Sequence, residues 1–551
     1  MRTAGFPLLT FIVFLPLVGA AVAALIPSSK EDRLLMPVAL IASLAEVALV
    51  VFLVVDFPSG QAGFQFVSQH SWIGAFGISW KVGVDGISLF LIAMTALLFP
   101  IAMFGPSLRG NRKAFMGWML LLEAACMGTF LSMDLFLFFV MFEVTLVPGY
   151  FLVAGYGGPR RNYAAMKFFI YTFAGSAFLF VAILSLVILT APANKGHETF
   201  DLITLGRLAS GLPHADQVLI FAGFAIAFAV KIPLVPLHSW LPDTYTEAPT
   251  SGSMVLAGIL FKLGAYGLLR LGVFLLPRGA ADLAPLLLTM AAVGITYGAL
   301  VTIMQKDLKR LVAYASIVDV AFIVLGFFAF SDQGVSGGVL EMVNHGLTTG
   351  AIFFLVGVIW ERRGTLRFSD LGGLQKPAPI LAAIFLVVVM SAVGLPGLNG
   401  FVGEFLVLVG TFVTHRWWAV VGTTAVVSGA VYLLWAYQRV FHGSTSEINE
   451  KFKDITWREI GMVAPLLAGI VFLGIYPKPF FDRVNPSVEY LLGHVEQVAP
   501  NADVPSQGSS AIKYTVPADQ SVDASTTANV GPGSSASSQQ ASAKQASGGG
   551  K

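Results

Sequence analysis

The amino-acid sequence predicts an all-α polytopic membrane protein with about fourteen transmembrane helices. Composition is the first indication: 56% of the 551 residues are hydrophobic and only 12% are charged, with a mean hydropathy of +0.78. The second is spacing, because apolar runs of about 20 residues, long enough to cross the hydrocarbon core, recur along nearly the whole chain. An ordinary soluble domain is excluded by this composition.

The apolar runs, separated by polar or proline-containing segments, give the expected spans in order. We expect crossings at residues 6–26, 34–55, 86–105, 114–131, 134–155, 166–190, 216–241, 251–276, 284–304, 308–330, 337–360, 378–412, 417–441 and 457–476.

Two of these spans are predicted to be broken helices. The seventh carries Lys231, which is followed by Pro233, Pro236 and Pro242, and each proline removes a backbone donor. The twelfth is too long for one straight crossing, and residues 393–405 hold a proline and four glycines. Interrupted helices at corresponding positions indicate repeated halves, here two inverted five-helix repeats formed by helices 4–8 and 9–13.

The expected organisation follows from these repeats. Helices 1–3 occupy residues 1–113, the first repeat 114–276, the second repeat 284–442, and helix 14 with a C-terminal segment 457–497. Residues 498–551 are rich in Ser, Ala, Gln and Gly and lack apolar periodicity, so they are predicted to form a disordered tail.

Orientation is predicted from lysine and arginine, which are concentrated in cytoplasmic loops. Nineteen of these residues lie in or beside loops that follow odd-numbered spans, against about nine on the other side. The odd loops are therefore expected in the cytoplasm and both termini on the outer side.

Seven ionisable side chains fall inside apolar runs, where a charge is costly and usually faces a protein interior or a water-filled path. His238, in the polar run that joins spans 7 and 8, is a further candidate. A structural interpretation stays open, because a buried Glu–Lys pair can hold helices together. The number of these residues favours function; they are Glu123, Glu143, Lys231, Lys262, Asp319, His345 and Glu404.

The residue types suit proton transfer. Burial brings both amines and carboxylic acids towards the pH range in which they exchange protons, whereas arginine does not deprotonate in practice. A Glu–Lys pair that opens and closes would act as a two-state switch, and Lys262, His345, Asp319 and Glu404 are expected to continue the path.

Cofactor motifs are not expected on this chain. The single cysteine, Cys126, forms neither an internal disulfide nor an iron–sulfur site, and no phosphate-binding loop occurs. His238, His345 and Glu247 lack metal-ligand spacing. Any electron carrier must therefore be elsewhere, and no nucleic-acid partner is expected.

The segment Lys231-IPLVPLHSWLPDTYTEAPTSGSMVLAGILFKLGAYGLLR resembles the signature of the proton-pumping family shared by antiporter-like subunits of complex I and Mrp-type cation/proton antiporters. The resemblance covers spans 3 to 13. Three further segments resemble the M-type subunits of bacterial NADH:quinone oxidoreductase (complex I) more than the larger L type: Gly77-ISWKVGVDGISLFLIAMTALL, Asp134-LFLFFVMFEVTLVP and Gly394-LPGLNGFVGEF.

The resemblance implies a role for each residue. Glu143 matches the family's carboxylate on helix 5, Lys231 its partner on helix 7 and Lys262 the central lysine on helix 8. Glu123 matches a carboxylate on helix 4, His345 the helix 11 histidine and Glu404 the terminal carboxylate on helix 12. One departure is Asp319, which stands where the helix 10 pattern has histidine.

The resemblance implies a subunit that moves protons outward, driven by electron transfer from NADH to quinone on other subunits. FMN, iron–sulfur clusters and quinone would lie on those partners, and L-type and N-type antiporter-like subunits would be neighbours in the lipid bilayer. Two alternatives stay open: a D-type subunit of a cation/proton antiporter, and a scaffold that does not pump.

Overall fold

The computed structural model describes residues 7–27, 31–105, 110–500, 502, 504 and 505. Nearly all of the predicted disordered tail, from residue 506 onward with 501 and 503, lies outside the described residues. The division of the chain at residues 113, 284 and 457 stays a prediction.

The all-α membrane class is confirmed, because thirteen helical segments of the described chain are long and apolar enough to cross a bilayer. Two shorter apolar helices, α16 (Pro379–Ala392) and α17 (Asn399–Thr414), occupy the predicted twelfth span. The thirteen are α1 (Leu8–Leu25), α2 (Glu31–Asp56), α3 (Gly86–Phe104), α4 (Arg112–Leu131), α5 with α6 (Leu135–Val144, Leu146–Tyr156), α7 (Arg161–Thr190), α9 (His214–Lys231), the segment Thr250–Val273, α13 (Pro277–Ile303), α14 (Leu308–Phe327), α15 (Asp332–Arg363), α18 (Arg416–Phe441) and α20 (Trp457–Ile475).

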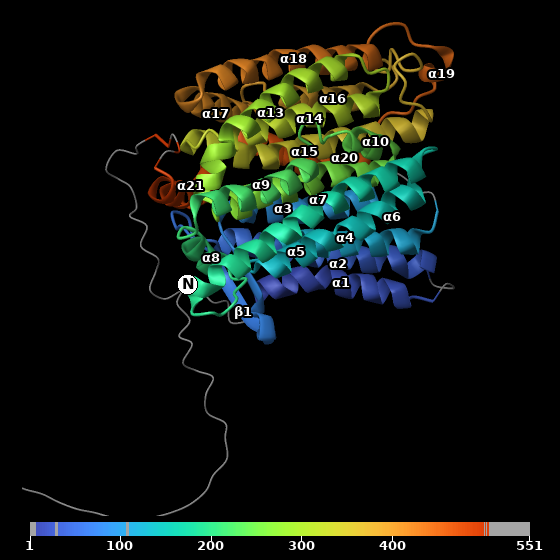
Figure 1. Ribbon diagram of the computed structural model, residues 1–551. Coiled ribbons are helices and arrows are strands. Elements are labelled where there is room, and N and C mark those ends of the chain that lie inside the picture. Colours follow the sequence, from blue (N-terminus) through green and yellow to red (C-terminus); the bar gives the residue numbers. More distant parts are fainter. Residues whose placement is uncertain (1–6, 28–30, 106–109, 501, 503, 506–551) are drawn as a thin grey trace, which may run out of the picture. The chain divides into compact units, whose positions relative to one another are not determined.

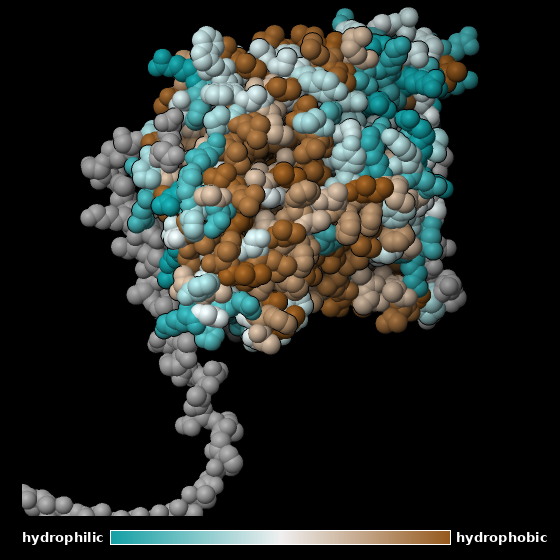
Figure 2. Space-filling view, viewed as in Figure 1, coloured by the Kyte–Doolittle hydropathy of each residue, from teal (hydrophilic) through white to brown (hydrophobic). Residues whose placement is uncertain are grey.

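The helices lie side by side, with α1 and α2 along one edge of the bundle and α16, α17 and α18 along the opposite edge (Figure 1). Apolar residues cover the middle of the visible face, and hydrophilic residues gather towards the two ends of the helices (Figure 2). This distribution is the one that a bilayer requires of a helical bundle.

Both predicted breaks are present. Helix α9 ends at Lys231, and the chain is irregular until α10 (Trp240–Glu247) begins. Helix α16 ends at Ala392, and the segment before α17 contains Gly394 and Gly397, both with positive φ angles. Positive φ values strain residues that carry a Cβ atom, so glycine suits these two positions.

Two spans depart from regular helix in ways that the sequence analysis did not predict. Span 5 is divided at Thr145, between α5 and α6. Span 8 consists of α11 (Thr250–Val255), the π-helical turn η4 (Leu256–Leu260), α12 (Phe261–Gly267) and the π-helical turn η5 (Leu268–Val273). Such π turns occur frequently at functional sites, and Lys262 lies on the short helix between them.

Several elements outside the spans were also not predicted, and three of them lie at one end of the bundle (Figure 1). A hairpin of β1 (Gln65–Ile73) and β2 (Ile78–Val84) contacts α8 (Leu202–Ala209) through an ion pair of Lys81 with Asp201, the N-cap residue of that helix. Helix α21 (Lys478–Val498) accepts a hydrogen bond at Asp482 from the backbone of Gly60, at 2.9 Å. The remaining short elements are η2 (Gly74–Phe76), η3 (Ala191–Asn194) and α19 (Glu447–Glu450).

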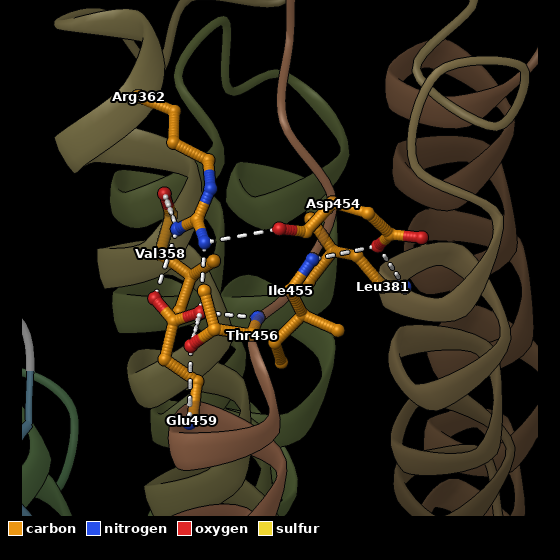
Figure 3. Close-up of polar contacts among 7 residues, drawn as sticks. All are labelled: Val358, Arg362, Leu381, Asp454, Ile455, Thr456 and Glu459. Carbon is orange, nitrogen blue, oxygen red and sulfur yellow. Dashed lines mark hydrogen bonds and ion pairs between the residues drawn. The ribbon is translucent and has the colours of Figure 1, made fainter.

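An ionic and backbone network joins three helix ends at the opposite side of the bundle (Figure 3). Arg362, near the end of α15, donates to both carboxylate oxygens of Glu459 on α20, at 2.9 and 2.7 Å. Asp454 accepts from the backbone N–H groups of Ile380 and Leu381 at the start of α16, at 2.9 Å each. These bonds fix one end of α15 and one end of α16. Both helices contribute residues to the candidate functional site.

Candidate functional site

The centre of the site is a direct contact between two buried ionisable side chains. Nζ of Lys262, on α12, lies 2.7 Å from Nδ1 of His345 on α15, and it also donates to the carbonyl oxygen of Ala257 at 2.8 Å. Lys262 is fully buried, and Nζ lies 3.9 Å from the centre of the Phe261 ring. Asp319 and Glu341 are the carboxyl groups that act electrostatically on this enclosed amine.

The other ring nitrogen of His345 continues the contact to Asp319. Nε2 lies 3.4 Å from Oδ2 of Asp319, on α14, and 3.3 Å from the hydroxyl of Thr349. The structure therefore brings together Lys262, His345 and Asp319 in that order. An imidazole between an amine and a carboxyl can accept a proton at one nitrogen and release one from the other.

Asp319 faces a small internal cavity of about 30 Å³, and a second cavity of about 20 Å³ shares part of its lining. A third of the Asp319 side chain is accessible, because it borders this space. Glu404 on α17 and Tyr432 on α18 line both cavities as well. Asp319 and Glu404 thus face common polar spaces, of the kind that hold bound water in proteins.

Glu341 on α15 also lines both cavities, and the sequence analysis missed it. Its carboxylate accepts a hydrogen bond from Nδ2 of Asn344 at 3.1 Å. The sequence held a signal that could have found it, because Glu341 lies four residues before His345 and therefore on the same helix face.

Lys231 lies at the end of α9, where the predicted break begins. The side chain is 2% exposed; Nζ contacts the hydroxyl of Thr145 at 3.4 Å and lies 4.5 Å from the centre of the Phe142 ring. Its stem packs on α12, because a Cβ atom at Gly264 would lie 3.0 Å from Cβ of Lys231. No hydrogen bond between described side chains joins Lys231 directly to Lys262.

Glu143 is the expected partner of Lys231, and the structure places the two near each other without a direct contact. It lies in the last turn of α5, where Ser176 and Lys231 are the polar groups that act most strongly on it. No ion pair within 4.0 Å joins the two residues, both of which the structure describes; Lys231 instead contacts Thr145, at the break between α5 and α6. The pair is thus seen in an open arrangement.

Glu123 lies on α4, where its carboxyl faces α2. It is fully buried on α4, and Ser43 of α2 donates to its carboxylate at 3.3 Å. The carboxyl of Glu46, also fully buried on α2, interacts with that of Glu123. Sequence reasoning missed Glu46, although it lies in the middle of an apolar run like the other seven.

His238 does not join the other candidates. It lies between α9 and α10, is 8% exposed, and its ring contacts that of Tyr297 edge to face, with centroids 5.2 Å apart. His238 therefore lies in the irregular segment between the end of α9 and the start of α10.

The fold and this site define a polytopic antiporter-like membrane protein with a buried series of amine, imidazole and carboxyl groups. The chain belongs to the NADH:quinone oxidoreductase/Mrp antiporter family, whose transmembrane model matches residues 132–429. Within the family it belongs with the proteins named NADH-quinone oxidoreductase subunit M, as the following similarities show.

Two curated relatives carry that name. The protein from Mycobacterium tuberculosis is 38% identical over 535 residues, covering 90% of this chain and 96% of the relative. The protein from Rhodobacter capsulatus is 39% identical over 503 residues, covering 88% of this chain and 96% of the relative.

Solved structures agree with the sequence relatives. A chain of respiratory complex I from Thermus thermophilus matches with a TM-score of 0.79 and 30% identity, over 88% of this chain and 99% of that chain. A chain of the Mrp complex from Dietzia sp. matches with a TM-score of 0.77 over 90% of this chain and 99% of that chain. That second likeness, at 20% identity, concerns the fold alone.

Proposed function

We propose that this chain is a proton-translocating membrane-arm subunit of NADH:quinone oxidoreductase, which moves protons outward while other subunits transfer electrons from NADH to quinone. The observation that carries the proposal is the contact series from Lys262 through His345 to Asp319, which opens into the cavity that Glu404 lines. A series of groups that bind and release protons, enclosed in a membrane bundle, is suited to proton transfer.

The geometry supports a stepwise transfer in the second half of the path. Nδ1 of His345 accepts a proton from the Lys262 ammonium, across 2.7 Å. The ring then releases the proton on Nε2 to the Asp319 carboxylate, across 3.4 Å. Each N–H or O–H bond that forms is matched by one that breaks, and the ring returns to its first state when its proton moves back to Nε2.

The first half of the path needs a gate, and Lys231 supplies it in this proposal. Protons reach Lys231 from the cytoplasmic side near the break between α9 and α10, where His238 lies. In the arrangement described, the Lys231 amine contacts a neutral hydroxyl while Glu143 is near but unpaired with it. Closing the Glu143–Lys231 pair stabilises the ammonium, and opening it favours release of the proton towards Lys262.

Several further features belong to the same proposal. FMN, iron–sulfur clusters and quinone lie on partner subunits, and L-type and N-type antiporter-like subunits are neighbours in the membrane arm. The chain lies in a bacterial inner membrane with both termini on the outer side. The hairpin, α8 and α21 follow even-numbered spans and share one end of the bundle, which supports placing the even loops on one side of the membrane.

The test uses the assembled complex in inverted membrane vesicles. Lys231→Ala and Glu143→Gln are each expected to lower NADH-driven acidification roughly ten-fold or more, as loss of a proton-transfer group does. Complex content, measured by immunoblot of the native complex, should be unchanged. If both variants pump protons and reduce quinone normally, the proposal is wrong.

The same membranes separate the two alternatives. A D-type antiporter subunit would not copurify with flavin and iron–sulfur proteins and would exchange cations without NADH. A scaffold subunit would tolerate neutral substitutions at every buried charge once the complex had assembled.

A further inference from the structure

We propose that Glu341 is a further proton-carrying residue, which receives protons from the Asp319 side of the shared cavity and passes them to Glu404. This inference rests on the proposed function and adds a residue to its path. It gives the second half of the path three carboxyl groups around one pair of cavities.

The position of Glu341 supports this role. It lies one helical turn before His345 on α15, so both side chains point from the same face of that helix. Asp319, Glu341, Glu404 and Tyr432 each line both cavities, and they come from four different helices. Glu341 is itself only 6% exposed, so its carboxyl is directed into this enclosed space.

A second observation concerns Asn344, which is 1% exposed and lines the larger cavity. Its Nδ2 donates to Glu341 at 3.1 Å and to the carbonyl oxygen of Asn399 at 2.8 Å, whereas its Oδ1 has no hydrogen-bond partner among the described residues. A buried polar atom without a partner points to a hydrogen-bond donor in the cavity, such as water. The amide thus holds one oxygen of Glu341 in place beside a polar space.

The approach of α17 to α15 brings Glu404 to the same space. Gly403 precedes Glu404, and a Cβ atom at this position would lie 2.7 Å from Nδ2 of Asn344 and would also contact the Glu341 carboxylate. Glycine therefore allows α17 to lie against the Glu341–Asn344 pair. The carboxyl groups of Glu341 and Glu404 also act on each other electrostatically. When one of them gains a proton, the proton affinity of the other therefore changes.

A purely structural role does not require a carboxyl group at this position. Among the described residues, Glu341 accepts its only hydrogen bond from Asn344, and the amide oxygen of glutamine would accept it equally well. A carboxyl in a membrane bundle is costlier than an amide and has one property that the amide lacks, since it binds and releases a proton. In the proposed step, the Asp319 O–H bond breaks as an O–H bond forms on Glu341, and the same exchange follows between Glu341 and Glu404.

The experiment compares three substitutions at this position in the assembled complex. Glu341→Gln keeps the acceptor for Asn344 but cannot carry a proton, and it is expected to lower NADH-driven acidification roughly ten-fold. Glu341→Asp keeps a carboxyl and should retain most pumping, while Glu341→Met removes both functions. Acidification is divided by the amount of assembled complex, so that an assembly defect is not counted as lost transfer.

Glu361→Gln is the matched control, because it makes the same change at the exposed end of the same helix. Lys262→Ala is measured beside it to test the proposed function itself. If Lys262→Ala stops pumping while Glu341→Gln pumps normally, the role of Glu341 is refuted and the proposed function stands. If Lys262→Ala also pumps normally, the proposed function fails. A complex in which Gln is tolerated but Met and Asp are not would assign Glu341 a structural role and overturn the inference.

Discussion

The amine of Lys262 lies 2.7 Å from Nδ1 of His345, and both side chains are enclosed by the bundle. Because α12 is flanked by π-helical turns, this lysine reaches α15 from a helix whose regular hydrogen bonding is interrupted on both sides. The contact joins α12 to α15 through an ionisable pair, and the chemistry of this pair determines the first prediction.

Lys262→Arg is expected to stop proton pumping although it keeps the positive charge. Arginine holds its proton under all relevant conditions, so it cannot donate to His345 and recover. We expect acidification to fall by roughly ten-fold or more, measured by fluorescence quenching in inverted vesicles. Lys309→Arg is the control, since Lys309 is also buried but donates to the carbonyl oxygen of Ala248. Normal pumping in Lys262→Arg would mean that this lysine does not release its proton.

The next prediction concerns Asp319, which stands where the family's helix 10 pattern has histidine. Its carboxylate lies 3.4 Å from Nε2 of His345, so Asp319→Asn keeps the size but removes the group that accepts the proton. We expect roughly a ten-fold loss of acidification in Asp319→Asn and substantial retention in Asp319→Glu and Asp319→His. The vesicle assay is repeated with matched complex content. Equal pumping by Asp319→Asn and the unmodified protein would remove Asp319 from the path and leave His345 to connect directly with the cavity.

Much of this fold and site could be predicted from the sequence, because a bilayer imposes a simple pattern on the chain. Apolar length gave the crossings, and the prolines after Lys231 and the glycines around Pro396 gave both breaks. The hairpin of β1 and β2 was not predicted. It lies outside the spans, where the requirement for about 20 consecutive apolar residues does not apply.

The missed site residues have a different cause. Glu341 and Glu46 lie in apolar runs as clearly as Glu123 does, but their relevance depends on which helices are neighbours. The bond between Lys231 and Thr145 likewise depends on which helices pack together, although Pro148 marks the break between α5 and α6, because it cannot donate to the carbonyl oxygen of Val144. The separation of these residues along the sequence does not predict their contacts, because the contacts depend on which helices pack together.

The Glu46–Glu123 pair is predicted to stabilise the contact between α2 and α4. Three of its four carboxyl oxygens have no hydrogen-bond donor among the described residues, so a proton shared by the two groups would supply the missing bond. Glu46→Leu leaves the Glu123 carboxyl without this partner and should destabilise the subunit by about 1–3 kcal/mol. Thermal unfolding of the purified complex in detergent gives the comparison.

The double variant Glu46→Leu/Glu123→Leu provides the control for that prediction. Because it removes both polar groups, it should lose less stability than the sum of the two single variants. Strictly additive losses would show that the two carboxyls do not interact in the folded subunit.

The last prediction concerns pH and the docking of α21, which lies outside the spans. His494 is buried against the Phe274 ring, and burial lowers the pKa of its imidazole to about 4. When α21 is undocked this side chain titrates near its ordinary pKa of about 6.5, so the undocked form binds a proton that the docked form does not. Docking is therefore fully stable above about pH 6.5 and weakens as pH falls towards 4, by up to about 2 kcal/mol at pH 5.

Hydrogen exchange of the α21 amides at pH 7.5 and pH 5, corrected for the intrinsic rates, measures this loss. Burial raises the pKa of Glu489 on the same helix, which works in the opposite direction, so the contribution of His494 must be isolated. His494→Phe keeps a ring against Phe274 but cannot bind a proton, and its protection should not fall between pH 7.5 and pH 5. An equal loss of protection in both proteins would assign the pH response to another group.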